Sequence, residues 1–185
     1  MLPRRRNGLA TGCGTSYWKA VAVLKPPDSH HASAASGWLE LGNPREAAAE
    51  LDRVSPAHRG HPAVLELSWR IHAEEKRWQA ALEVATQLIQ TAPERPTGWI
   101  DQSFALHELQ RTREAWEVLL PVAGRFPKTS IIPYNLACYA CQMGNHAEAR
   151  RWLAKAIKLR TQDDIKQLAL ADKDLEPLWA EIKDW

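Results

Sequence analysis

Small and large apolar positions recur along this chain with a fixed spacing of 34 residues. The small position is alanine in every copy, at Ala47, Ala81, Ala115 and Ala149. Further apolar positions follow on the same helical face, and most of them are larger: Leu51, Ala85, Leu119 and Leu153, and then Val54, Leu88, Val122 and Ala156. Steps of four and three residues keep all of these side chains on one face of a helix. The period therefore predicts an all-α solenoid of helix–turn–helix repeats, in which each repeat buries its apolar face against its neighbours.

Turn-forming residues recur where the first helix of each repeat should meet the second. They are Gly42-Asn43-Pro44, Lys76-Arg77, Gln110-Arg111-Thr112 and Gly144-Asn145. Gly and Asn suit a left-handed residue at a helix C-terminus, and proline suits the first turn of the next helix. Pro93 and Pro127, again 34 residues apart, should end the second helices of their repeats. Pro121 falls inside the second helix of the third repeat and should kink or shorten it.

These signals divide the chain into three parts. They are a basic N-terminal arm (1–27), four repeats (28–61, 62–95, 96–129 and 130–163) and a C-terminal cap (164–185). The arm is rich in glycine and basic residues, so we expect it to be irregular or disordered, with at most a short helix over residues 17–24.

The cap follows from the need of a solenoid to cover its last repeat with one polar face outward. We expect one or two capping helices, with Leu178, Trp179 and Ile182 packing on the last repeat. The carboxylates Asp172 and Asp174 have the pattern of solvated surface charges.

The repeats resemble the tetratricopeptide-repeat family. Its motif places Trp, Leu-Gly and Tyr on the first helix, Ala-x3-Phe on the second helix and Pro at the end. The matching residues are Trp38, Gly42, Ala47, Leu51 and Val54; Leu65, Trp78, Ala81, Leu88 and Pro93; Trp99, Ala115, Leu119 and Pro127; and Leu136, Ala137, Gly144, Ala149, Leu153 and Ala156. Trp69 and Ser103 depart from it, because a small Gly or Ala is usual there. The resemblance covers residues 28–163 and implies a right-handed superhelix whose concave face is lined by the first helix of each pair.

The same resemblance implies that the concave groove binds another protein or a peptide. The candidate groove residues are Arg70, Ile100, Phe104, His107, Tyr134, Asn135 and Cys138. Among them we expect Ile100, Phe104 and Tyr134 to contact the partner, because bulky apolar side chains facing solvent form interaction surfaces. The alternative is that these side chains pack under a neighbouring repeat or under the C-terminal cap.

Some members of the family clamp the terminal carboxylate of a chaperone tail with Lys, Arg and Asn side chains in the groove. A carboxylate needs such charge-assisted donors to offset its desolvation. The matching positions here hold Ala32, Ser36, Leu67 and Asp101, and Asn135 lacks basic companions. We therefore expect no chaperone carboxylate-tail binding.

Candidate chemistry elsewhere in the chain is sparse. Cys138 and Cys141 form a Cys-x-x-Cys pair in mid-helix, without the second pair that zinc commonly needs. His58 and His61 lie in a turn with no carboxylate or cysteine nearby in sequence. No nucleophile elbow or phosphate-binding glycine loop is present. We expect no cofactor, no metal and no enzymatic activity.

Composition and charge limit the partners further. The net charge is +2 and 45% of the residues are hydrophobic, so nucleic acid is not an expected partner. No apolar run approaches the roughly 18 residues of a membrane span, and no secretory signal core follows Arg4-Arg5-Arg6. Three cysteines favour a reducing compartment, so we expect a cytoplasmic protein without membrane contact. The alternative function is an assembly module that self-associates or docks through a solenoid end, with Trp179 and Trp185 as the residues to test.

Overall fold

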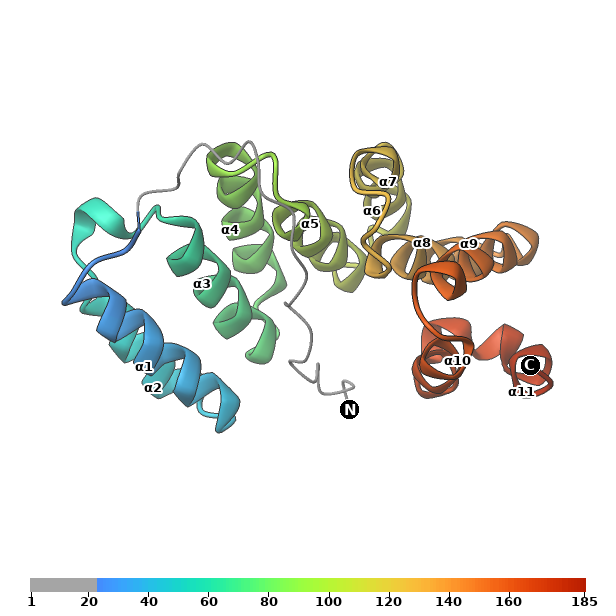
Figure 1. Cartoon of the computed structure of the whole chain (residues 1–185), viewed down its shortest axis with the longest axis horizontal. Helices are drawn as coiled ribbons and strands as arrows, with labels where there is room; N and C mark the ends of the chain where they lie inside the picture. Colours follow the sequence, from blue (N-terminus) through green and yellow to red (C-terminus); the bar gives the residue numbers. More distant parts are fainter. Residues whose placement is uncertain (1–22) are drawn as a thin grey trace.

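The computed structural model describes residues 23–185, and all regular structure in that part of the chain is helical. The paired helices are α1 (Asp28–Glu40) with α2 (Pro44–Asp52), α3 (Pro62–Glu74) with α4 (Trp78–Thr91), α5 (Pro96–Glu108) with α6 (Thr112–Leu119), and α8 (Ile131–Gln142) with α9 (His146–Leu159). A 3-10 turn, η1 (Pro56–His58), precedes α3, and the short helix α7 (Val122–Arg125) precedes α8. The pairs stack side by side along an arc (Figure 1). The predicted all-α solenoid is confirmed.

Three further elements complete the C-terminal end. They are α10 (Gln162–Ala171), the 3-10 helix η2 (Lys173–Leu178) and α11 (Trp179–Lys183). Figure 1 shows α10 and α11 on one side of α8 and α7 on the other. The short helix expected over residues 17–24 falls largely outside the described residues.

The periodic alanines lie where paired helices approach each other. All four have no exposed surface, and the large apolar positions that follow them are buried as well. The approach is also tight between α4 and α5, where a β-carbon added at Gly98 would lie 3.0 Å from Ile89 Cγ1. Because a larger side chain would separate the axes, small residues are required at these points.

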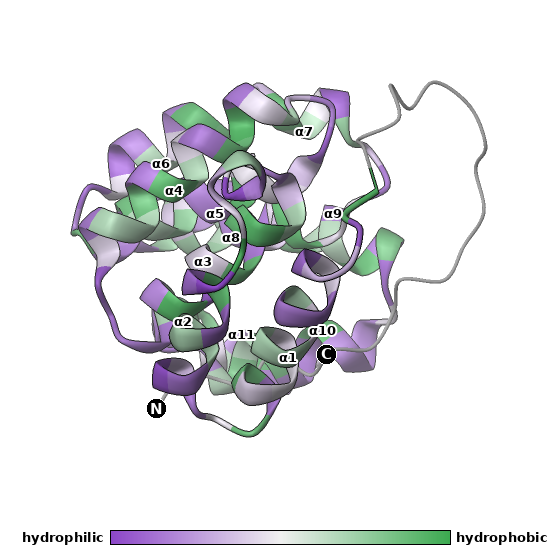
Figure 2. Ribbon diagram, turned by 90° about the vertical axis from the view of Figure 1, so that its left-hand side faces the viewer, coloured by the Kyte–Doolittle hydropathy of each residue, from purple (hydrophilic) through white to green (hydrophobic). Residues whose placement is uncertain are grey.

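Buried side chains form three clusters along the solenoid, and hydrophobic bands lie along the facing sides of the helices (Figure 2). The first joins α1, α2 and α3, and the second centres on Trp69. The third runs from α5 to the C-terminus and includes Leu175, Leu178 and Ile182. Since this third cluster is continuous, the C-terminal elements share one core with the last two helix pairs, as expected for Leu178 and Ile182.

Pro121 breaks the second helix of the third pair, as predicted. Helix α6 ends at Leu119, and the chain resumes as the one-turn helix α7 at Val122. A proline has no N–H to give to the preceding turn, so the continuous helix seen in α4 and α9 cannot form here. Leu120 is left 39% exposed beside the break.

The turns inside the four helix pairs share one backbone feature, a residue with a positive φ angle. Gly42, Lys76, Gln110 and Gly144 have positive φ angles of 74°, 56°, 63° and 77°. Each of these residues ends a first helix in the left-handed conformation that satisfies the last carbonyls. Glycine adopts it without steric cost, whereas a residue with a β-carbon does not. The two non-glycine turns are therefore strained.

This asymmetry predicts opposite effects for two substitutions at equivalent positions. Gln110→Gly should stabilise the protein by about 1 kcal/mol, because it removes the steric cost of the β-carbon. Gly144→Gln should destabilise it by about the same amount for the reverse reason. Urea unfolding followed by circular dichroism measures both free energies. A change of the same sign in both variants would contradict the explanation.

Candidate partner-binding groove

The face that the first helices share is divided into two halves. We call the half around Arg70 and Phe104, on α3 and α5, the open half. Both side chains keep part of their surface exposed. The other half, around Tyr134 and Cys138 on α8, we call the closed half, because residues Asp172–Leu178 cover it. We call that stretch the C-terminal segment.

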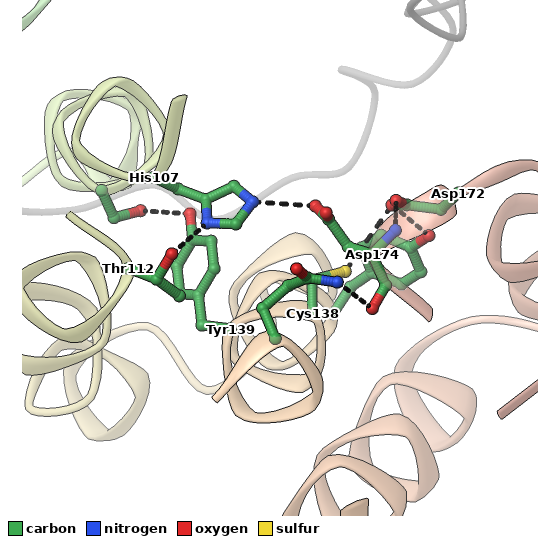
Figure 3. A network of polar contacts seen from close by, with 9 residues as sticks. His107, Thr112, Cys138, Tyr139, Asp172 and Asp174 are labelled. Carbon is green, nitrogen blue, oxygen red and sulfur yellow. Dashed lines mark hydrogen bonds and ion pairs between the residues drawn. The ribbon is translucent and has the colours of Figure 1, made fainter. Parts of the chain in front are cut away.

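Asp172 makes the first set of contacts in the closed half (Figure 3). Its Oδ2 accepts a hydrogen bond from the Tyr134 hydroxyl at 3.0 Å and from the Cys138 thiol at 3.6 Å. Its Oδ1 accepts from the backbone N–H of Asp174 at 3.0 Å. The carboxylate thus turns its own segment and binds two groove side chains.

Asp174 makes the second set, to α5 and α8. Its Oδ2 lies 2.9 Å from His107 Nε2, and the other ring nitrogen of that histidine lies 2.9 Å from Thr112 Oγ1 (Figure 3). The backbone carbonyl of Asp174 accepts from Gln142 Nε2 at 2.9 Å. The ring of His107 also rests against Tyr139, with centroids 5.0 Å apart. The segment is therefore tied to two successive first helices.

Apolar burial completes the docking. Leu175 has no exposed surface and Leu178 is 1% exposed. Fully burying a leucine contributes about 1.5–3 kcal/mol relative to leaving it in water. The burial of two leucines and the hydrogen bonds of two aspartates therefore both stabilise the segment on the groove.

The closed half corrects two expectations from the sequence. Ile100, His107, Tyr134, Asn135 and Cys138 are all buried, so they do not line an open groove as expected. For His107, Tyr134 and Cys138 the cause is the C-terminal segment lying on them.

Asp172 and Asp174 are likewise not the solvated charges that their pattern indicated. The sequence signal that could have revealed them is an acidic pair followed directly by Leu175 and Leu178. Such a segment combines acceptors with apolar anchors.

Burial changes the ionisation of this cluster. Desolvation, reinforced by the nearby Asp174, raises the pKa of Asp172 above its usual 3.8. Desolvation also raises the pKa of Tyr134 and of Cys138 well above their ordinary values. Cys138 therefore stays a thiol at neutral pH and is a hydrogen-bond donor here, not a thiolate nucleophile.

The open half has mixed character. The Phe104 ring meets Trp69 and Trp78 edge to face, with centroids 6.2 and 5.7 Å apart. On the same two helix pairs, Glu66 of α3 forms an ion pair with Arg95, the residue before α5, at 3.0 Å. This half thus offers a fixed aromatic side chain together with the Arg70 guanidinium.

Known structures share this architecture, although no protein-family model and no curated protein matches the sequence. A thermophilic TPR protein of Thermus thermophilus has a TM-score of 0.70 at 17% identity, over 84% of this chain and 82% of that chain. MamA, from residue 41 to its end, of Desulfovibrio magneticus RS-1 has a TM-score of 0.67 at 18% identity, over 86% of this chain and 93% of that chain.

The chain has the tetratricopeptide-repeat fold. The identities are low, so the likeness concerns the fold and not the ligand. The comparison says nothing of the open and closed halves, which are observed within residues 23–185 of this chain.

A Ser–His–Asp cluster lies at the start of this tetratricopeptide-repeat domain. Asp28 Oδ2 lies 2.6 Å from both Ser55 Oγ and His58 Nδ1, and these bonds, that of Ser55 foremost, lower the pKa of Asp28 to about 2. A catalytic triad needs Ser and Asp on opposite imidazole nitrogens. Here Ser55 Oγ lies 3.1 Å from the same Nδ1, so the cluster ties α1 to the turn after α2.

The remaining candidate chemistry is accounted for by structural bonds. His61 Nδ1 accepts from the backbone N–H of Ala63 and so caps α3. Cys138 and Cys141 are buried free thiols. No three His, Cys, Asp or Glu side chains within residues 23–185 are arranged to hold a metal ion. In the same range no helix has the length and apolar character of a membrane span.

The raised pKa of Asp172 predicts a pH-dependent effect of Asp172→Asn, which keeps a carbonyl acceptor but cannot ionise. In the wild type the protonated form is favoured on folding, so its stability falls as the pH rises from about 3.8 through the raised folded-state pKa. The variant should therefore gain stability relative to the wild type over that range, and the difference should be constant above it.

Urea unfolding from pH 3 to pH 8 measures this difference. Asp163→Asn, at an exposed position on α10, is the matched control and should not show the same growing difference. Parallel profiles for Asp172→Asn and wild type would show that the ionisation of Asp172 does not affect docking.

Proposed function

We propose that this protein is a tetratricopeptide-repeat scaffold that binds a segment of another protein in the open half of its concave groove. The observation that supports it most is the C-terminal segment itself. It occupies the adjoining half through the contacts a peptide ligand would make, which are carboxylates on polar side chains and leucines in apolar sites. The concave face of this chain is therefore suited to hold a polypeptide segment.

The open half supplies the corresponding groups for a partner in trans. Phe104 is fixed by two tryptophans, so contact with it costs little side-chain entropy. Arg70 provides the donors that a carboxylate or carbonyl of the partner would need. Aromatic and arginine side chains are the types that contribute most binding energy at interfaces. Binding rather than catalysis is what these groups support.

This proposal predicts that two substitutions in the open half remove the same partners. Affinity capture with Arg70→Glu and with Phe104→Ser should retain at least about tenfold less of a bound protein than wild type, equivalent to about 1.4 kcal/mol. Arg113→Glu, an exposed position on α6, is the matched charge control and should retain it fully.

Folding must be verified before capture, because Phe104 contacts Trp69 and Trp78. Circular dichroism and thermal unfolding should be close to wild type for Arg70→Glu, whose side chain is part exposed. Identical capture by wild type and by a folded Arg70→Glu would overturn the assignment of the open half.

A second candidate function is self-association or docking through a solenoid end. Helix α1 lies at one end of the arc formed by the described helices (Figure 1). The feature that favours this function is an apolar strip there, in which Ala34, Trp38 and Leu41, the residue just after α1, follow one helical face. Leu41 is 77% exposed and Trp38 is 37% exposed.

The other end of the solenoid is less suited to docking. Trp179 donates its indole N–H to the backbone carbonyl of Ala169 at 2.8 Å, and Trp185 packs against the third core cluster. Both of these tryptophans are engaged within the chain. The α1 strip is therefore the better candidate surface for self-association or docking.

Sedimentation velocity over a range of protein concentrations tests this second function. We expect concentration-dependent association in wild type that is lost in Trp38→Glu/Leu41→Glu, because a charge in an apolar contact is strongly unfavourable. Ala49→Glu, at an exposed position on α2, should associate like wild type. A wild-type protein that stays monomeric at all concentrations would exclude self-association.

A further inference from the structure

A second surface lies between α7 and α9, away from the concave face. We call it the α7–α9 groove. Its volume is about 450 Å³, and the lining residues that matter here are Leu120, Phe126, Trp152, Lys155, Lys158 and Leu159. Cavities of roughly 300–1,000 Å³ are the usual size for binding a ligand or side-chain cluster. Figure 1 shows α7 and the C-terminal elements on opposite sides of α8, so the two surfaces do not compete.

The groove lies beside the helix break at Pro121. In α4 and α9 the second helix runs without interruption for 14 residues, but in the third pair it ends at Leu119 and restarts as a four-residue turn. Leu120 on one side and Leu159 on the other remain 39% and 40% exposed.

The floor of the groove is aromatic and fixed in place. Trp152 is 7% exposed, and its ring meets Trp116 edge to face with centroids 6.1 Å apart. Lys155 Nζ lies 3.6 Å from the centroid of the Trp152 ring, in a cation–π contact. Because these side chains are already ordered, an apolar anchor can settle on them at little entropic cost.

The rim of the groove is cationic. Lys155 and Lys158 line it, and no acidic side chain does. Neither lysine forms an ion pair with another described residue, whereas neighbouring Arg150 and Arg151 on the same helix pair with Glu181 and Glu148. The two ammonium groups are therefore available to carboxylates from outside the chain.

We propose that the α7–α9 groove binds a short acidic segment of another protein, which inserts a large apolar side chain between Leu120 and Leu159 and places carboxylates beside Lys155 and Lys158. The apolar floor supplies the burial and the lysines supply the charge complementarity that selects acidic partners. An uncharged or basic segment would leave both lysines unpaired at the rim. The proposal does not depend on the concave groove, since it concerns different residues on the opposite side of α8.

A displayed library of random dodecapeptides provides the probe. Peptides are selected on the full-length wild-type chain and depleted on the Leu120→Ser/Leu159→Ser variant, and the selected peptides are then synthesised with a fluorescent label. We expect sequences that combine Asp or Glu with Leu, Phe or Trp. Their fluorescence anisotropy should report binding that weakens as salt is added.

Variants of the lysines decide the charge assignment. Lys155→Glu/Lys158→Glu should weaken binding by about tenfold or more, because two attractions between a lysine and a peptide carboxylate become repulsions. Arg45→Glu/Arg113→Glu changes the net charge equally at exposed positions elsewhere and should bind like wild type. Lys155→Gln/Lys158→Gln, which keeps the helix propensity, serves if the double Glu variant is not folded by circular dichroism.

The contrary outcomes are equally definite. The proposal is overturned if no selected peptide depends on Leu120 and Leu159, or if those that do carry no acidic residues. It is overturned as well if a duplex oligonucleotide binds as tightly as the peptides and is unaffected by Leu120→Ser/Leu159→Ser, which would assign the lysines to nucleic acid. Loss of wild-type dimers in the lysine variant would instead assign the groove to a second copy of this chain.

Discussion

The close approach of two helices at a small side chain is the constraint on which this structure depends. Ala47, Ala81, Ala115 and Ala149 have no exposed surface, and each lets the second helix of a pair lie against the first. A single pair cannot cover its own apolar face, so the pairs must stack. Stacking at a fixed period places all first helices on one face of the arc. The concave groove is thus a consequence of where the alanines recur.

The closed half of that groove depends on a different balance of forces. The C-terminal segment buries Leu175 and Leu178, and its docking leaves Asp172 and Asp174 only partly exposed to water. A partly desolvated carboxylate is tolerated only when donors replace the lost solvent. Tyr134 and other groove side chains supply those donors. Tyr134, Cys138 and His107, which have the chemistry to bind an external ligand, therefore bind the chain's own C-terminal segment.

Pro121 lies beside the α7–α9 groove, on the face of the solenoid away from the concave groove. Pro121 divides a helix whose counterparts α4 and α9 run without a break, and Trp152 and Leu159 lie beside the groove next to this break. The two faces have different chemistry. The open half carries the Phe104 ring and the Arg70 guanidinium, and the α7–α9 groove carries two lysines without an ion pair to a described residue on an apolar floor.

Helix periodicity, capping and proline sterics act within a few residues. The solenoid, the turns at Gly42 and Gly144 and the break at Pro121 could therefore be predicted from the sequence alone. The state of the groove could not be predicted in this way. Tyr134 meets Asp172 across 38 residues of sequence, and His107 meets Asp174 across 67. No local pattern encodes such contacts, since they depend on where the chain returns after the last repeat. The division of the concave face into an open and a closed half therefore becomes visible in the folded chain and not in its sequence.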